Sequence, residues 1–294
     1  MKKVSYIFLA FAIVSLWSVP VRAQDTDEEK AQAVIEKINQ LENECFPANS
    51  SNGYQKSTGV KDGKEYEYYS NEYYQKARFS IATDDFSPEE KKAMPDLDKI
   101  EKWYNHTSNI FNIVAHGGVK PGTQVSSNRI LVGGEYFTAE EFAPVLLKHL
   151  KQYQIILAMK QEPLTIVLHS CFAGQGDNSF AQQLVDILSK DIQDVAVVAG
   201  EQIVSFEKDP KTGEVLQDYV ISEKDTKRCL DNPTSPIRMS EQPLPWKVFR
   251  PGVAPEKGET DALATVTSIN QKYFENLEKE YKAGKRVIMP TSMK

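Results

Sequence analysis

The stretch that most constrains the fold of this chain is an apolar run, Leu164–Leu168, which ends in His169, Ser170 and Cys171. Apolar and β-branched residues without alternation are typical of a strand that is buried on both faces. Glycines at 174 and 176 then break the strand into a loop. Because open α/β sheets carry their chemistry at the carboxyl ends of such strands, the Cys171 thiol lies where a catalytic group is expected.

A second apolar run lies upstream at 110–115, and it also ends in a reactive side chain, His116, which is followed by two glycines. Helical periodicity covers 138–159 between the two runs. Strand, helix and strand form a βαβ unit, whose crossover makes the two strands parallel and usually neighbouring. We therefore predict that His116 and Cys171 lie side by side at one edge of a sheet, as a Cys/His dyad.

This dyad has the parts that acyl transfer requires. A thiol nucleophile needs a base to take its proton, and the developing oxyanion needs hydrogen-bond donors. His116 is the candidate base, and the backbone N–H groups of Gly117 and Cys171 are candidates for the oxyanion hole, since a glycine lets a substrate carbonyl approach closely. The plain alternative is that Cys171 is an ordinary buried core thiol.

The order of these motifs, His116-Gly117 after one strand and Ser170-Cys171 after the next, resembles the caspase-like (clan CD) cysteine peptidases. The closest likeness is to the self-cleaving cysteine protease domain of large clostridial and MARTX toxins, over roughly residues 66–250. The resemblance implies a caspase-like three-layer α/β sandwich with a mostly parallel central sheet and helices on both faces. It also implies a β-hairpin flap, expected at 202–221, with Trp246 as the tryptophan beyond it.

The resemblance implies further roles at the same edge. His169, two residues before the nucleophile, is expected to line the S1 pocket, with Ser170 and Gly118 as further substrate contacts. Alternatively, His169 only bonds to nearby backbone, or it competes with His116 as the base. An aspartate that orients His116 is expected at Asp96 or Asp98.

Toxin domains of this kind are activated by inositol hexakisphosphate. Seven basic residues fall in the corresponding region, and solvated surface charge is the simpler explanation for them: Lys208, Lys211, Lys224, Lys227, Arg228, Lys247 and Arg250. No cofactor is required by the proposed chemistry.

The beginning of the chain reads as a secretory signal at 1–23, with cleavage after Ala23, and the protein is expected to be periplasmic or secreted. An uncleaved membrane anchor is the alternative, although the apolar run is short for a span. We expect an N-terminal helix and a flexible, cleavable loop at 24–63, the peptidase domain at 64–258 and a C-terminal helix at 259–294.

Within the peptidase domain, two strands at 64–82 are expected to flank the central sheet. A helix is expected from Ser87, with a break at Pro95. A third buried strand is predicted at 194–199, and 222–258 is expected to be irregular.

Composition excludes several function classes. A net charge of −6 and a pI of about 5.4 argue against binding to nucleic acids or anionic membranes. Four histidines without His-Glu-x-x-His spacing predict no metal site, and the sequence has no Gly-x-Ser-x-Gly motif of the kind that serine hydrolases carry.

Of the three cysteines, Cys45 and Cys229 either form a disulfide or are two free thiols. We expect a monomer that acts on a peptide or protein.

These observations predict a secreted cysteine endopeptidase that uses the dyad of Cys171 and His116 and that processes itself within the 46–63 loop. The alternative is a catalytically inactive member of the same fold that serves as a secreted binding module.

Overall fold

The computed structural model describes residues 33, 36, 56–61, 64–69, 80–82, 86–104, 109–117, 128–132, 134–160, 163–231 and 239–285. The predicted leader and most of the predicted N-terminal helix lie outside these ranges. So do Gly118 and Cys45.

A six-stranded sheet forms the centre of the structure, in the order β13-β12-β9-β8-β4-β3. Four neighbouring strands, from β9 to β3 in this order, are parallel to one another. Strand β12 runs antiparallel to β9, and the short edge strand β13 runs antiparallel to β12. The strands are β3 (Ser80–Ala82), β4 (Ile110–Val114), β8 (Leu164–His169), β9 (Val195–Ala199), β12 (Lys247–Phe249) and β13 (Glu256–Lys257). Every residue of β4, β8 and β9 is buried, because packed layers cover both faces of the sheet. The protein is therefore a mixed α/β fold with a mostly parallel central sheet, as the apolar runs predicted.

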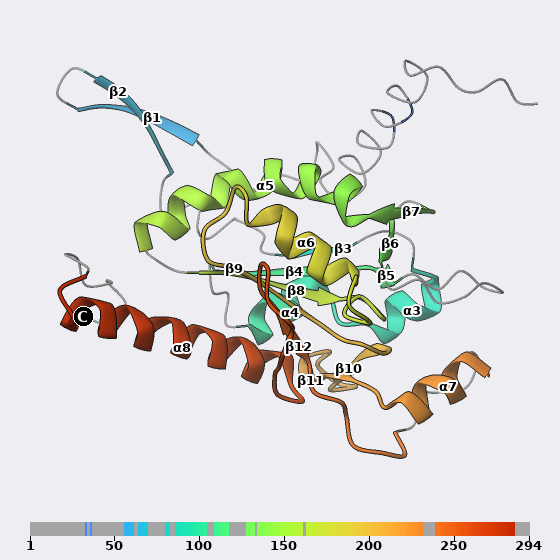
Figure 1. Ribbon diagram of the computed structural model, residues 1–294. Coiled ribbons are helices and arrows are strands. Elements are labelled where there is room, and N and C mark those ends of the chain that lie inside the picture. The colour runs from blue at the N-terminus through green and yellow to red at the C-terminus, as the bar shows by residue number, and fades with distance from the viewer. Residues whose placement is uncertain are drawn as a thin grey trace, which may run out of the picture.

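Helices α5 (Ala139–Lys160) and α6 (Phe180–Leu188) pack on one face of this sheet (Figure 1). Alternate residues of the central strands, such as Ile113, Ile166 and Val197, contribute to the core beneath these helices. Helix α5 begins with a capping box: the Glu141 carboxylate accepts from the Thr138 backbone N–H at 2.9 Å, and the Glu141 N–H donates to the threonine hydroxyl at 3.3 Å.

Helices α4 (Leu97–Trp103) and α8 (Ala262–Lys282) share the core on the opposite face, where the remaining strand residues point. Val114, Val167 and Val198 belong to this second core, and Trp246 is its largest fully buried side chain. Figure 1 shows α8 running along the side of the sheet away from α5 and α6.

The predicted helix start at Ser87 is confirmed as α3 (Pro88–Ala93). Ser87 and Glu90 form a capping box: the Ser87 N–H donates to Glu90 Oε2 at 2.7 Å, and the Glu90 N–H donates to the serine hydroxyl at 3.2 Å. Met94 ends this helix, and α4 begins two residues after Pro95, so the predicted break is also confirmed.

Two small sheets flank the carboxyl edge of the central strands. One is antiparallel and contains β5 (His116–Gly117), β6 (Arg129–Val132) and β7 (Glu135–Thr138). The other is the predicted hairpin, β10 (Val204–Lys208) and β11 (Val215–Val220), which we call the flap.

Two predictions about the edges of the domain are only partly right. Strand β3, in the second half of 64–82, lies at the edge of the central sheet beside β4, as predicted. Strand β2 (Lys64–Tyr69) pairs with β1 (Lys56–Lys61) in a separate hairpin instead of flanking the central sheet, so part of the predicted flexible loop is a strand. The segment 222–258 is not irregular throughout, because it contains α7 (Glu223–Asp231) and the two antiparallel strands β12 and β13. Strands β12 and β13 form because they pair with neighbouring strands through their backbones, and their mixed composition did not indicate this pairing.

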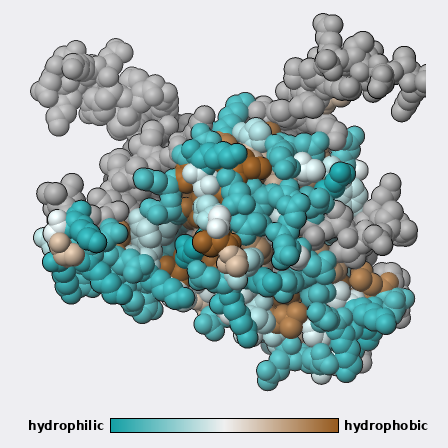
Figure 2. Space-filling model, viewed as in Figure 1, coloured by the Kyte–Doolittle hydropathy of each residue, from teal (hydrophilic) through white to brown (hydrophobic). Residues whose placement is uncertain are grey.

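The surface shown in Figure 2 is mainly hydrophilic, and its hydrophobic residues lie in small, separated groups. Within the ranges given above, none of the helices is both long and apolar enough to cross a membrane.

Candidate active site

The register of the central sheet brings the two predicted residues together. Val114 of β4 pairs with His169 of β8, and two residues beyond each of these positions come His116 and Cys171. A Cβ atom built on Gly117 would lie 1.5 Å from the carbonyl oxygen of Cys171 and 2.9 Å from its nitrogen. The backbone of Gly117 therefore rests directly against the backbone of the candidate nucleophile.

Cys171 begins a tight turn at the end of β8, and the residue as a whole is partly exposed although its thiol group is buried. The next residue, Phe172, has a φ of 61°, which is rare for a residue with a side chain. Two contacts oppose this strain: the Phe172 ring is buried, and its N–H donates to the carbonyl of Gln202 at 3.1 Å. The turn holds the thiol at the carboxyl end of β8.

The surroundings of the thiol favour its protonated form. Burial raises the pKa of Cys171, hydrogen bonds from backbone N–H groups, chiefly that of Val204, lower it in part, and the negative charge of Glu90 raises it further. The sulfur therefore lies between the first residue of the flap and an acidic side chain of α3, and it carries its proton at neutral pH.

His116 is 29% exposed at its side chain, and its ring contacts Glu90 of α3 and Phe86, which lies two residues before that helix. Its Nε2 atom lies 3.6 Å from Oε1 of Glu90, and its ring packs 4.3 Å from the ring of Phe86. Burial acts to raise the pKa of Glu90, but the hydrogen bonds from Ser87 and the nearby His116 together bring this pKa below its ordinary value. An ionised carboxylate thus faces the imidazole.

Glu90 is the site residue that sequence reasoning missed. Its place in the capping box was visible, but nothing in the sequence indicated that the free oxygen of the same carboxylate reaches His116. Glu90 is the acid seen at this contact, whereas Asp96 is the N-cap residue of α4 and Asp98 lies in its first turn; an orienting role for either of these aspartates stays a prediction. Among the described contacts, none is a hydrogen bond between His116 and Cys171, and the ring and the sulfur face separate partners in this conformation.

His169 does not fit the predicted role in an S1 pocket, because its side chain has no exposed surface. Its Nε2 atom hydrogen-bonds to Oδ1 of Asn112 at 3.0 Å, and the rings of Phe206 and Trp246 pack at 4.9 and 6.0 Å. Burial lowers the pKa of His169 to about 3, so the ring is neutral at pH 7. Its burial also argues against a role as the competing base. The alternative prediction, that His169 bonds to nearby backbone, also differs from the structure, in which its hydrogen-bond partner is the side chain of Asn112.

Of the other two predicted substrate contacts, the structure describes only Ser170. Ser170 is buried with 1% of its surface exposed, and its hydroxyl has no hydrogen-bond partner among the described residues. Gly118 lies outside the described residues.

A second buried acid lies beside His169. Asp218 of β11 accepts a hydrogen bond from the Tyr104 hydroxyl at 2.5 Å and one from the Ala262 N–H at 3.0 Å. Its Oδ2 atom lies 3.9 Å from Nδ1 of His169, but the two do not form an ion pair at pH 7 because the imidazole is neutral. Burial raises the pKa of Asp218 to about 7, against the opposing hydrogen bond from Tyr104.

These two buried groups contribute opposite pH dependences to stability. In the folded state the pKa of His169 lies below its unfolded value, so its contribution is lost as pH falls below about 6.5. The folded-state pKa of Asp218 is raised, so its contribution grows as pH falls below 7.

The variant His169→Gln tests these opposite contributions. When the pH is lowered from 7 to 5, we expect its free energy of unfolding to rise by about 2 kcal/mol more than that of wild type, because only the Asp218 contribution remains. Urea unfolding at both pH values measures this. An unchanged difference between variant and wild type at the two pH values would contradict it.

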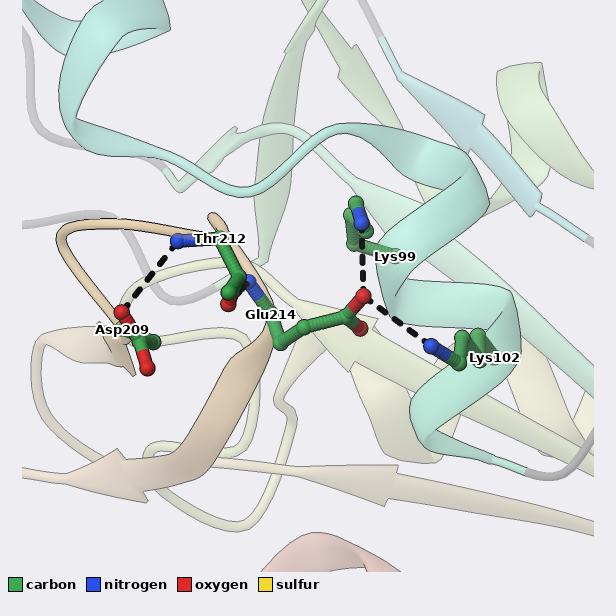
Figure 3. Close-up of polar contacts among 5 residues, drawn as sticks. All are labelled: Lys99, Lys102, Asp209, Thr212 and Glu214. Atoms are coloured by element: carbon green, nitrogen blue, oxygen red, sulfur yellow. Dashed lines mark hydrogen bonds and ion pairs between the residues drawn. The ribbon is translucent and has the colours of Figure 1, made fainter.

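The tip of the flap is fastened to α3 and α4. Figure 3 shows Glu214, just before β11, accepting from Lys99 and Lys102 of α4, at 2.7 and 3.0 Å. On the other strand, Lys208 Nζ donates to the carbonyl oxygens of Lys92 and Met94, at 2.7 and 3.0 Å. The flap therefore contacts the nucleophile at one end and the helix that carries Glu90 at the other.

The seven basic residues predicted to attract a polyanion are mostly engaged elsewhere. Lys208 bonds to the two carbonyl groups, and four others pair with acidic residues: Lys224 with Glu241, Arg228 with Asp225, Lys247 with Glu201 and Arg250 with Glu256. This pairing favours the simpler explanation of surface charge, and an inositol hexakisphosphate-like activator stays a prediction.

The remaining predicted chemistry concerns thiols and metals. Cys229 is a free thiol in this structure, and its proposed partner Cys45 lies outside the described residues. Within the part of the chain that the structure describes, no group of three or more His, Cys, Asp or Glu side chains is arranged to hold a metal ion.

Comparisons with known proteins do not assign this site. No protein-family model matches the sequence, and a search of curated proteins also gives no match.

Proposed function

We propose that the protein is a cysteine endopeptidase of caspase-like architecture. The observation that carries this proposal is the contact between the backbones of Gly117, the residue after His116, and Cys171 at the carboxyl edge of the parallel strands. The helices on both faces of the sheet and the flap beside the thiol also agree with such an architecture.

In the proposed reaction, the Cys171 sulfur attacks the carbonyl carbon of the scissile peptide bond, and its proton passes to His116. Nε2 of His116 faces Glu90, so Nδ1 is the nitrogen left to accept this proton. The N–H groups of Gly117 and Cys171 stabilise the tetrahedral oxyanion, and the imidazolium then protonates the leaving amine. Water hydrolyses the resulting thioester and restores the thiol.

The raised pKa of the thiol fits a resting state in which the proton stays on sulfur until a substrate displaces the flap. Catalytic hydrogen bonds are often long or absent in unbound enzymes and tighten when the substrate binds. The test is hydrolysis of a mixed-sequence fluorogenic peptide library by the mature protein, with the Cys229→Ser variant as a control for the other described thiol. Hydrolysis that requires Cys171 supports the proposal.

The rival function is an inactive fold used as a binding module. The same raised pKa favours it, because a permanently protonated thiol is a weak nucleophile. Peptide capture without cleavage at any position of the library would support this rival and overturn the peptidase.

Glu90 has a testable part in the peptidase reaction. Glu90→Gln keeps the side-chain size and the hydrogen bond to Ser87, but it removes the negative charge that faces His116. We expect kcat to fall by about tenfold to a hundredfold with KM nearly unchanged, because the imidazolium loses its counter-charge. Steady-state kinetics measure this. The matched control is Glu214→Gln, which removes an acidic group from the flap tip and leaves the surroundings of His116 intact; equal losses in the two variants would contradict the assigned role.

Export is proposed from the sequence of residues 1–23, which carry the basic start, apolar centre and small residue of a secretory signal. The amino-terminal residue of the protein recovered from its natural host tests this. Gln24 at the amino terminus is the expected result, and retention of Met1 would contradict cleavage.

A further inference from the structure

The flap is tied to the body of the protein by a buried carboxyl group. Asp218 lies in the middle of β11 and is fully buried. Its two oxygens accept hydrogen bonds from separate elements: the Tyr104 hydroxyl at the end of α4, and the backbone N–H of Ala262 at the start of α8. Separating β11 from these two helices would break both bonds and expose the carboxyl group to water.

The same hairpin also contacts the nucleophile. The backbone N–H of Val204, the first residue of β10, faces the Cys171 sulfur, and the carbonyl of Gln202 accepts from the Phe172 N–H. Phe206 pairs with Asp218 across the flap and stacks on His169, two residues before the nucleophile. Any movement of β11 away from α4 and α8 is therefore transmitted to the cover of the thiol.

We propose that Asp218 is a pH-dependent fastener of the flap: protonated, it holds β11 against α4 and α8 and keeps Cys171 covered, and ionised, it releases the flap. The inference concerns the regulation of the site described above, but it rests on the contacts of the flap alone. It applies whether the thiol cleaves peptides or not.

The physical reason is the cost of an ionised carboxylate in this position. Burial is the main cause that raises the pKa of Asp218 to about 7, whereas a carboxyl group hydrated by opening of the flap has its ordinary pKa near 3.8. Between these two pH values, opening releases a proton, so a rise in pH favours the open flap by up to about tenfold per pH unit. Above pH 7 both forms are ionised and the effect levels off.

Three other titratable groups face Asp218. Tyr104 donates to it, and Asp261, the N-cap residue of α8, adds a negative charge that opposes its ionisation. His169 acts in the opposite direction, because an imidazole hydrated by opening gains a proton below about pH 6.5 and so favours opening at low pH. The test must separate this contribution from that of Asp218.

Hydrogen–deuterium exchange of the amides at 203–220 makes this separation in the intact mature protein. Asp218→Asn keeps the shape of the side chain but cannot ionise, and it leaves His169 in place. We expect the ratio of wild-type to variant exchange rates in the flap to rise at least tenfold from pH 5 to pH 7 and to level off above pH 7. Intrinsic exchange rates and the His169 contribution cancel in this ratio.

Two controls make the result specific. Exchange in α6 should show no pH-dependent ratio, and Asp231→Asn, at the exposed end of α7, should behave as wild type in the flap. A ratio that is equal at pH 5 and pH 7 overturns the proposal. If Asp218→Asn does not fold, Tyr104→Phe serves instead: loss of the hydroxyl that stabilises the ionised carboxylate should move the levelling-off to higher pH, and an unmoved profile overturns the proposal.

This experiment does not use peptide hydrolysis. If the protein cleaves no peptide but shows the predicted ratio, the proposed function is wrong and the proposed role of Asp218 stands. If the protein is an active peptidase but the ratio does not change with pH, the proposed function stands and the proposed role of Asp218 is wrong.

Discussion

Replacement of Gly117 by alanine is expected to destabilise the fold by about 3 kcal/mol and to slow peptide hydrolysis by on the order of a hundredfold. The new Cβ would lie 1.5 Å from the Cys171 carbonyl oxygen and 2.5 Å from its carbonyl carbon, and both of these atoms are backbone. No change of rotamer relieves such an overlap, so β5 and the nucleophile turn must move apart. A shift of about 1 Å between a nucleophile and its base costs on the order of a hundredfold in rate.

Thermal unfolding and the rate of iodoacetamide modification of Cys171 measure the two parts of this prediction. The matched control is Gly284→Ala, which is strained by a φ of +68° but has open space at its Cβ position. It should lose only about 1 kcal/mol, with an unchanged labelling rate. A Gly117→Ala protein with the melting temperature and labelling rate of wild type would show that the two backbones are not in contact.

Replacement of Cys171 by alanine is expected to remove all peptide hydrolysis, together with iodoacetamide labelling at this position. The sulfur is the only group in the proposed mechanism that bonds covalently to the substrate, and its loss leaves no acyl-enzyme. Stability should change by no more than about 1 kcal/mol, because only one small sulfur atom is removed. Cys229→Ser should retain wild-type hydrolysis. Hydrolysis at the wild-type rate by Cys171→Ala would end the peptidase assignment.

The same variant tests self-processing. Intact-mass comparison of wild type and Cys171→Ala should show a cut within 46–63 in the wild type only. The same cut in both proteins would assign it to another protease.

Local sequence patterns predicted the parts of this fold that depend on local physics. The apolar runs that became β4 and β8 predicted strands buried on both faces, and the helix between them made these strands parallel neighbours. Capping chemistry at Ser87 placed the start of α3 correctly. Strand β12 was missed because Lys247–Phe249 is short, and only its pairing with β9 makes it a strand.

The sequence predicted the part of the site that depends on two neighbouring strands, but not the part that depends on contacts with distant segments of the chain. The places of His116 and Cys171 follow from the register of two strands. The partner of His116 does not, because Glu90 reaches it from a helix that lies 26 residues earlier in the chain and packs there through tertiary contacts. His169 looked like a pocket residue from its position, but the flap and Trp246 cover it.

The sequence by itself therefore determined the α/β class, the parallel arrangement of β4 and β8 and the edge at which an imidazole and a thiol emerge, since these depend on burial periodicity and chain direction. Only the tertiary structure decided which acid faces His116, how far the thiol is covered, and that burial beneath the flap shifts the pKa values of Asp218 and His169 toward their neutral forms. The pKa of a side chain depends on every group that packs around it, and those groups come from distant parts of the chain.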